Sequence, residues 1–251
     1  MNEGINNNYP LLEAVHLTKK YEDGVLALDD LNFSVKAREI YAMLGGNGAG
    51  KTTAINIFLN LIEPTSGEAK IRGIVSHSDP LKAKQFVSFV SENVMLYPEF
   101  TALQNLDFFV RLGGKINYTK DNYKEVLIRV GLQEDAHNKK LKGFSKGMRQ
   151  KCGIAIAILK DVPAILLDEP TSGLDPKAGL EFMRLLDELR DDGKAILMST
   201  HDIFRAKEIA DVVGIMNNGK LVMQKSRDEI KNDDLEKLYV EYMAGYMEKV
   251  A

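Results

Sequence analysis

A glycine-rich segment near the start of the chain constrains its fold more than any other feature of the sequence. Residues 45–52 read GGNGAGKT, which matches the pattern G-x-x-x-x-G-K-S/T. The preceding apolar run, Ile40–Leu44, is typical of a strand, and residues 51–62 favour a helix that ends before Glu63-Pro64. A strand, a glycine loop and a helix in this order predict a phosphate-binding loop, because inward-turned backbone N–H groups and a helix N-terminus attract anions.

The side chains of this loop are those that nucleotide phosphates require. Lys51 is placed to bridge the terminal phosphates, and the Thr52 hydroxyl is placed to ligate Mg²⁺. The alternative is a glycine-rich turn that carries Lys51 by chance, and the flanking strand and helix disfavour it. The predicted nucleotide-binding residues of this segment are Gly45, Gly46, Asn47, Gly48, Ala49, Gly50, Lys51, Thr52 and Thr53.

Two consecutive acids, Asp168 and Glu169, stand at the end of a second apolar strand predicted over Ala164–Asp168, in the segment AILLDE. Phosphoryl transfer needs a carboxylate that holds Mg²⁺ and a base that activates water. Asp168, at the end of the strand, fits the metal role, and Glu169 fits the role of the base. A solvated acidic turn before Pro170 would explain the two acids alone, but together with the upstream loop they indicate a P-loop NTPase.

The order of apolar patterns predicts the fold class. Short strand-like runs alternate with helical patterns, whereas helical periodicity replaces them between roughly residues 95 and 160. We therefore expect an α/β fold: a P-loop NTPase core of mixed β-sheet with flanking helices plus an inserted α-helical subdomain. A single domain is expected over residues 1–251, with a C-terminal segment from roughly residue 220 that begins with a hairpin at Asn218-Gly219.

Composition excludes several classes of protein. The single cysteine, Cys152, cannot form an internal disulfide framework, and a formal net charge of −3 gives no bulk positive field for nucleic acid. No apolar run approaches the ~20 residues of a membrane-spanning helix, and the polar first residues lack the apolar core of a secretion signal. We therefore expect a cytoplasmic protein that binds no nucleic acid.

Four further motifs relate these two sites to a known family. Residues 144–151 (FSKGMRQK) resemble the signature motif of ATP-binding cassette (ABC) proteins, and residues 172–175 (SGLD) resemble the D-loop of that family. Residues 199–201 (STH) resemble its switch histidine, and Lys20-Tyr21 resembles its adenine-stacking aromatic. The motifs occur in the family's order over nearly the whole chain, which therefore resembles the nucleotide-binding subunit of an ABC transporter.

The resemblance implies an ATP hydrolase that works as a pair of subunits. Two subunits would face each other head to tail, with ATP between the phosphate loop of one and the signature helix of the other. Ser145, Gly147 and Asp175 would then contact nucleotide from the second subunit. His201 would position the attacking water, and Tyr21 would stack on adenine. The implied partners are a transmembrane permease, on whose cytoplasmic face the chain would sit, and a second ATP-binding subunit, identical or different.

Three positions differ from the residues that are most frequent in the family. Gly46 stands where proline is frequent, and Lys146 replaces a glycine in a variant that resembles exporter-type subunits. Alignment on Leu96-Tyr97-Pro98 places Glu92 where the family usually has a glutamine that touches Mg²⁺ and communicates with the membrane partner. The metal ligands implied are Thr52, Glu92 and Asp168. Lys146 and Gly147 are also poor choices for the first turn of a helix, as is expected at a functional site.

Two rival functions and one structural question stay open. The first rival is a soluble ABC ATPase, for example one in cluster assembly, and the second is a binding module that has lost hydrolysis; intact catalytic residues disfavour the second. A helical stripe near the C-terminus either covers its own domain, the interpretation we favour, or contacts a partner. Its members are Leu235, Leu238, Tyr239, Tyr242, Met243, Tyr246 and Met247.

Overall fold

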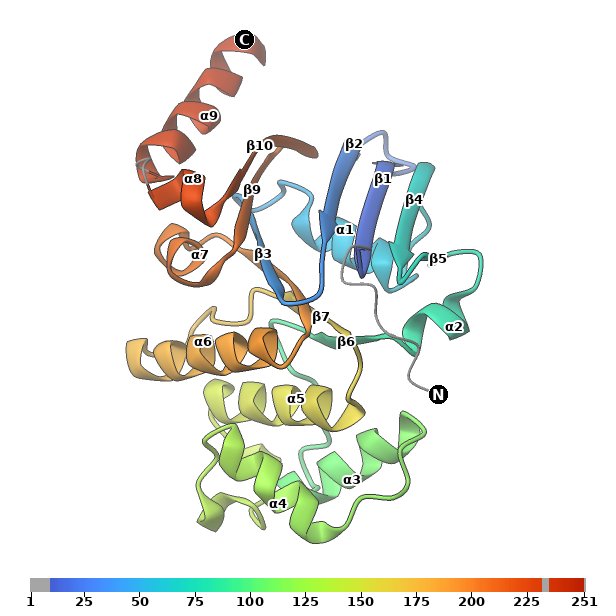
Figure 1. Cartoon of the computed structure of the whole chain (residues 1–251), viewed down its shortest axis with the longest axis vertical. Coiled ribbons are helices and arrows are strands. Elements are labelled where there is room, and N and C mark those ends of the chain that lie inside the picture. The colour runs from blue at the N-terminus through green and yellow to red at the C-terminus, as the bar shows by residue number, and fades with distance from the viewer. Residues whose placement is uncertain (1–9, 232–234, 251) are drawn as a thin grey trace.

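The computed structural model describes residues 10–231 and 235–250, which form two β-sheets with helices around them (Figure 1). The central sheet has six strands in the order β10-β9-β3-β8-β7-β6, parallel throughout except for the antiparallel pair β9 and β10. Its strands are β3 (Glu39–Leu44), β6 (Val87–Val90), β7 (Ala164–Asp168), β8 (Ala195–Thr200), β9 (Val212–Asn217) and β10 (Lys220–Ser226). This architecture confirms the expected mixed α/β class.

A smaller antiparallel sheet packs beside the central one, in the order β2-β1-β4-β5. It contains β1 (Leu12–Lys20), β2 (Leu26–Val35), β4 (Ser66–Ile71) and β5 (Ile74–Val75). Helix α1 (Lys51–Phe58) contacts strands of both sheets. The phosphate-binding segment, which lies between β3 and α1, is therefore held at the junction of the two sheets.

Alternation along the central strands divides the interior into two apolar cores. Ile40, Ala42 and Leu44 of β3 belong to one core, whereas Tyr41 and Met43 belong to the other, and all five are fully buried. Successive side chains of a strand point to opposite faces of the sheet, so a strand buried on both faces reads as a continuous apolar run. This burial explains why the apolar runs at β3, β7 and β8 were visible in the sequence.

Helices cover the central sheet and form a separate layer at one end. Helices α3, α4 and α5 pack on one another and lie at the bottom of Figure 1. Residues 102–160 contain these three helices and short 3-10 turns, with no strand of either sheet. The remaining helices are α2, α6, α7, α8 and α9. The bounds are α2 (Pro80–Lys84), α3 (Ala102–Leu112), α4 (Lys120–Arg129), α5 (Lys146–Lys160), α6 (Pro176–Asp191), α7 (Ile203–Ile209), α8 (Arg227–Lys231) and α9 (Leu235–Val250).

Helix α1 ends four residues before the predicted boundary at residue 62. Asn60 adopts a left-handed conformation with φ of 48°, and its N–H donates to the Ile57 carbonyl at 2.9 Å. The Leu61 N–H donates to the Asn56 carbonyl at 2.9 Å. These two hydrogen bonds form a Schellman motif, which satisfies the last carbonyls of the helix and stops it before Pro64 is reached.

The C-terminal segment begins as expected and then extends into a helix. Asn218 and Gly219 both have positive φ, 48° and 79°, as a two-residue hairpin between β9 and β10 requires. In α9, Leu235 is buried in the core, and Leu238 and Tyr239 pack against it. Tyr242, the next member of the predicted stripe, is exposed. The side chains of the last three members, Met243, Tyr246 and Met247, lie outside the described residues.

Candidate functional site

The phosphate-binding segment is packed so closely that two of its positions accept only glycine. A Cβ on Gly45 would lie 2.6 Å from the Met216 carbonyl oxygen, and a Cβ on Gly50 would collide with the Ala27 carbonyl oxygen. Gly50 has φ of 104° and is the N-cap of α1, a left-handed conformation that glycine adopts without a steric penalty. The loop is thereby fixed between β9 and β2, with the positive end of α1 behind it.

Lys51 is buried with its ammonium group fully partnered. The side chain is only 6% exposed, and its Nζ donates to the carbonyl oxygens of Gly45 at 2.6 Å and of Gly46 at 3.2 Å. Glu169 Oε1 lies 3.4 Å from the same Nζ. A buried cation needs such partners because its desolvation is costly, and a phosphate oxygen could replace any one of them.

Asp168 and Thr52 come together from opposite sides of the site. Asp168 Oδ1 accepts a hydrogen bond from Ser199 Oγ on the neighbouring strand at 2.5 Å and one from Thr52 Oγ1 at 3.2 Å. Mg²⁺ prefers oxygen ligands and takes one or two carboxylates together with substrate phosphates. Thr52 and Asp168 bring a hydroxyl and a carboxylate oxygen together, so these two residues could hold a metal whose remaining ligands come from a phosphate. In the described part of the chain no three His, Cys, Asp or Glu residues form a metal-binding group.

Glu169 turns away from Asp168 because its backbone is left-handed. Its φ is 46°, and its N–H donates to the Ser199 carbonyl oxygen at 3.2 Å and to Ser199 Oγ at 3.0 Å. A non-glycine residue in this region of backbone space is uncommon and is characteristic of functional sites. The Glu169 carboxylate consequently points to His201, whose Nδ1 lies 2.9 Å from Oε2, and to Lys51.

Lys51, Thr52, Asp168 and Glu169 line a cavity of about 480 Å³, named here the phosphate cavity. Sequence reasoning missed four residues of its wall, Val25, Leu26, Ala27 and Asn218. Val25 and Leu26 are exposed residues where the chain enters β2, and no periodic pattern marks them. Tyr21 is not part of the wall; its ring is 37% exposed and lies 5.2 Å from Lys19 Nζ. The full lining is Val25, Leu26, Ala27, Gly46, Asn47, Gly48, Ala49, Gly50, Lys51, Thr52, Thr53, Glu92, Asp168, Glu169 and Asn218.

The other predicted nucleotide contacts lie in a second cavity of about 370 Å³, the signature cavity. Ser145, Gly147 and Asp175 line it together with Lys146 and Gly173. Ser145 Oγ accepts from the Met148 N–H at 3.2 Å and caps α5, and Asp175 caps α6 by accepting from the Ala178 N–H at 2.9 Å. The structure therefore divides most of the predicted site residues of one chain between two cavities, whereas Tyr21, Gly45 and His201 line neither.

Glu92 lines the phosphate cavity but contacts neither Thr52 nor Asp168. Its Oε1 instead accepts a hydrogen bond from Ser172 Oγ at 3.0 Å and pairs with Lys146 Nζ at 3.3 Å. These two contacts, in that order of size, lower the pKa of the Glu92 carboxyl group below its ordinary value. The carboxylate is thus charged and already partnered.

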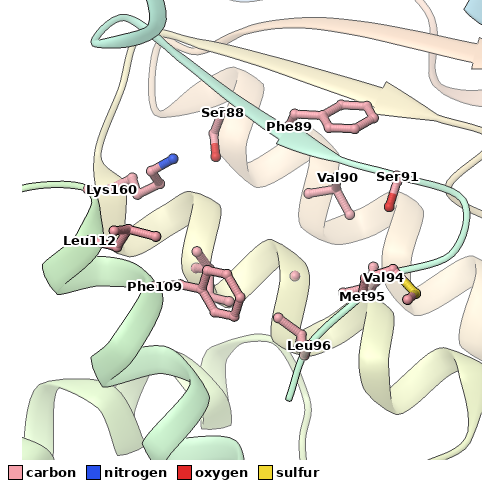
Figure 2. A pocket seen from close by; sticks show the side chains of 13 residues that line it. Ser88, Phe89, Val90, Ser91, Val94, Met95, Leu96, Phe109, Leu112 and Lys160 are labelled. Carbon is pink, nitrogen blue, oxygen red and sulfur yellow. The ribbon is translucent and has the colours of Figure 1, made fainter. Parts of the chain in front are cut away.

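An apolar groove of about 290 Å³ lies beside the Glu92 segment, between β6, α3 and α5. Figure 2 shows Met95 at one end of this groove and Lys160 at the other. Met95 is 85% exposed and Leu112 is 72% exposed. Burial lowers the pKa of Lys160, and no carboxylate among the described residues forms an ion pair with it. The lining is Ser88, Phe89, Val90, Ser91, Val94, Met95, Leu96, Phe109, Leu112, Gly113, Gly153, Ile156 and Lys160.

Comparison with known proteins finds relatives that match over most of the chain. The ABC transporter family matches residues 28–172. The bacitracin transport ATP-binding protein BcrA of Bacillus licheniformis is 37% identical over 241 residues, which cover 95% of this chain and 76% of BcrA.

Two solved structures are similar over most of the chain. The structure of an ATP-binding subunit of an ABC transporter has a TM-score of 0.80 and 31% identity, and the match covers 93% of this chain and 99% of that one. The dimeric ATP-binding cassette MJ0796 bound to ADP and Pi has a TM-score of 0.78 and 29% identity, covering 86% and 98% respectively. Over residues 10–231 and 235–250, no helix combines the length and apolar character needed to cross a membrane.

Proposed function

The chain belongs to the ABC transporter family and is an ATP-binding, ATP-hydrolysing subunit, and from this premise we propose that it powers export through a separate membrane permease. The chain would act as one domain over residues 1–251, with α3–α5 as its inserted helical part, on the cytoplasmic face of the membrane. The observation that carries the proposal is the division of the nucleotide-binding residues between the phosphate cavity and the signature cavity.

Division of the site supports head-to-tail pairing of two subunits. The phosphate cavity offers Lys51 and the loop N–H groups, whereas Ser145 and the Gly147 N–H lie at the start of α5 in the signature cavity. A helix start offers unpaired N–H groups and a partial positive charge to an anion. A nucleotide bound in the phosphate cavity of one subunit would therefore be completed by the signature cavity of a second.

The contacts of the phosphate cavity support specific roles in hydrolysis. Lys51 would exchange its carbonyl partners for phosphate oxygens, and Thr52 and Asp168 would hold Mg²⁺, whose charge offsets that of the phosphates. Glu169 would accept the proton of a water molecule whose oxygen bonds to the γ-phosphorus while the bond to the bridging oxygen breaks. His201 would orient that water together with Glu169.

The apolar groove is the surface on which we place the permease. Its wall includes Ser91 and Val94, which lie on either side of Glu92 in the sequence, whereas Glu92 itself lines the phosphate cavity. A segment seated in the groove would therefore contact the same stretch of chain that borders the nucleotide site. Lys160, partly desolvated and without an ion-pair partner among the described residues, favours an occupant that ends in negative charge. We infer that the occupant is a permease helix with an apolar face and an acidic residue, or a carbonyl-bearing C-terminus, opposite Lys160.

Export as the direction of transport is supported by Lys146, which belongs to the sequence variant that resembles exporter-type subunits. The relative BcrA, which is named for bacitracin transport, supports a role in transport without giving its direction. A soluble ABC ATPase without a permease is the competing function. ATP hydrolysis that changes when a permease is present would distinguish the transport subunit from the soluble ATPase.

The test is to express the chain with the membrane protein encoded beside its gene and to measure phosphate release from ATP. Co-purification with that protein and hydrolysis that responds to it are expected. Met95→Glu should reduce co-purification about tenfold or more, because it places a charge in an apolar interface. The matched control is Leu81→Glu, at a position that is 81% exposed outside the groove. Hydrolysis without any association would indicate the soluble ATPase.

A further inference from the structure

The Glu92–Lys146 ion pair is a direct contact between the two cavities of the nucleotide site. Glu92 lines the phosphate cavity, whereas Lys146 lies in the signature cavity between Ser145 and Gly147. The two side chains are 44% and 28% exposed, so each could exchange its partner for one that arrives from outside. A ligand that binds in one cavity and displaces one side chain of this pair would therefore change the contacts of the side chain in the other cavity.

One face of α5 holds the backbone around Glu92 independently of the ion pair. Lys146, Gln150 and Gly153 follow at intervals of four and three residues and so lie on the same side of the helix. Gln150 is 1% exposed, and its Nε2 donates to the Glu92 carbonyl oxygen at 2.8 Å. The bare backbone of Gly153 admits Val94, whose methyl carbon would lie 3.1 Å from an added Cβ. Loss of the Lys146 charge would thus leave the Glu92 side chain with only its hydrogen bond from Ser172, while its backbone stays in place.

The Lys146 side chain also lies close to Gly173, in the segment that follows Asp168 and Glu169. Its Cδ and Nζ lie 3.5 Å and 3.6 Å from the position of a Cβ on Gly173, whose φ is 68°. Ser172, next to Gly173, donates to the same Glu92 oxygen that Lys146 contacts. The carboxylate oxygen is therefore shared between α5 and the loop that joins Glu169 to α6.

We propose that Lys146 is a positioning residue that withholds the Glu92 carboxylate from the Mg²⁺ position of its own phosphate cavity. A phosphate group of a nucleotide bound to a second subunit would take over Lys146, and Glu92 would then keep only the neutral Ser172 donor, which it would exchange for Mg²⁺ beside Thr52 and Asp168. The physical reason is competition: a carboxylate whose charge is offset by an ammonium group is a weaker ligand for a cation, and a triphosphate attracts that ammonium more strongly than one carboxylate does. The inference rests on the proposed head-to-tail function.

The first measurement is metal binding to the purified full-length chain with ADP, using Mn²⁺ as a spectroscopic substitute for Mg²⁺. Lys146→Met should tighten Mn²⁺ binding about two- to fivefold, the range expected for removal of a partly exposed ion pair. The gain should be absent when Lys146→Met is added to Glu92→Gln. Lys142→Met is the control, because it removes an equal charge from a position outside both cavities, where Lys142 pairs with Glu99 at 3.3 Å.

The second measurement is formation of the ATP-bound dimer in a Glu169→Gln background, followed by sedimentation. Lys146→Met should weaken this dimer about two- to fivefold, because the variant loses its contact with the phosphate of the second subunit. Tighter metal binding together with a weaker dimer is the expected signature. A merely structural role of Lys146 would weaken both.

Several outcomes would overturn the inference. They are unchanged Mn²⁺ affinity in Lys146→Met, a gain that persists without Glu92, an equal gain in Lys142→Met, and a dimer that is not weakened. If the parent chain binds Mn²⁺ and nucleotide but Lys146→Met behaves like the parent, this inference alone fails. If the parent chain binds no nucleotide, the proposed function fails as well.

Discussion

His201 Nδ1 lies 2.9 Å from Glu169 Oε2, and the other carboxylate oxygen of Glu169 lies 3.4 Å from Lys51 Nζ. Glu169, which follows β7, thereby contacts both Lys51 of the phosphate-binding loop and His201, the residue that follows β8. Its side chain is 15% exposed, whereas that of His201 is 58% exposed. The imidazole therefore reaches outward from an anchored carboxylate.

Glu169→Gln should preserve ATP binding, lower hydrolysis by a hundredfold or more and accumulate an ATP-bound dimer. The amide keeps the shape of the side chain but cannot accept a proton, and general-base catalysis typically contributes about 10²–10⁴ in rate. Phosphate release and size-exclusion chromatography with ATP measure the two effects. Glu188→Gln, at an exposed position on α6, is the matched control. Unchanged steady-state hydrolysis in Glu169→Gln would refute the assignment of the base.

Lys51→Ala should weaken ATP binding about ten- to a hundredfold, the cost of losing hydrogen bonds between a charged donor and the phosphates. Titration with a fluorescent ATP analogue measures the change. Lys142→Ala removes a lysine that is 61% exposed outside both cavities and should bind nucleotide like the parent chain. Equal affinity of Lys51→Ala and the parent chain would show that the loop is not a phosphate site.

Local patterns made the phosphate loop and the central strands predictable. Gly45 and Gly50 occupy positions where the backbone leaves no room for a Cβ, so the fold itself demands the residues that form the motif. Strand β7 was predicted with its observed bounds because a strand buried on both faces is apolar throughout. In both cases the structure constrains residues that lie close together in the sequence, so a local sequence pattern predicts the feature.

Features that depend on distant residues were not predictable in the same way. Strands β4 and β5 pair at the edge of the small sheet and have mixed burial, so they show no continuous apolar run. The contact of Glu92 with Lys146 joins residues 54 positions apart, and no local pattern encodes it. Similarly, Asn60 ends α1 through its left-handed conformation, whereas the sequence pointed to Pro64 as the helix terminator.

Glu92→Gln should keep ATP hydrolysis within about tenfold of the parent chain, a barrier change of about 1.4 kcal/mol at most. The amide can still accept a hydrogen bond from Ser172 and offer an oxygen to a metal, although it loses the charge that pairs with Lys146. Steady-state phosphate release at saturating Mg²⁺ measures the effect. Complete loss of hydrolysis in a folded variant would give the acid an essential role beyond charge balance.

Cys152 should resist alkylation while the chain is folded. The side chain is fully buried, and burial raises the pKa of its thiol to about 12. The reactive thiolate is stabilised only as pH rises toward that pKa, so at pH 8 its fraction is about a thousandfold below that of an ordinary cysteine. Iodoacetamide labelling followed by mass spectrometry should show modification in guanidinium chloride but not in buffer. Labelling of the folded chain as fast as glutathione would contradict this burial.

Gly214→Ala should destabilise the fold by about 1–3 kcal/mol, the usual cost of overpacking a core. Gly214 lies in β9, where an added Cβ would collide with the Tyr41 hydroxyl oxygen and lie 2.8 Å from Leu221 Cδ1. Tyr41 is fully buried and donates a hydrogen bond to Gln224 Oε1 at 3.0 Å, so it cannot move aside without losing that bond. Gly143→Ala is the control, because a Cβ at that position meets no atom within 4 Å. Urea unfolding should show a lower midpoint for Gly214→Ala and a change of no more than about 0.5 kcal/mol for Gly143→Ala; equal midpoints for the two variants would contradict the packing described for β3 and β9.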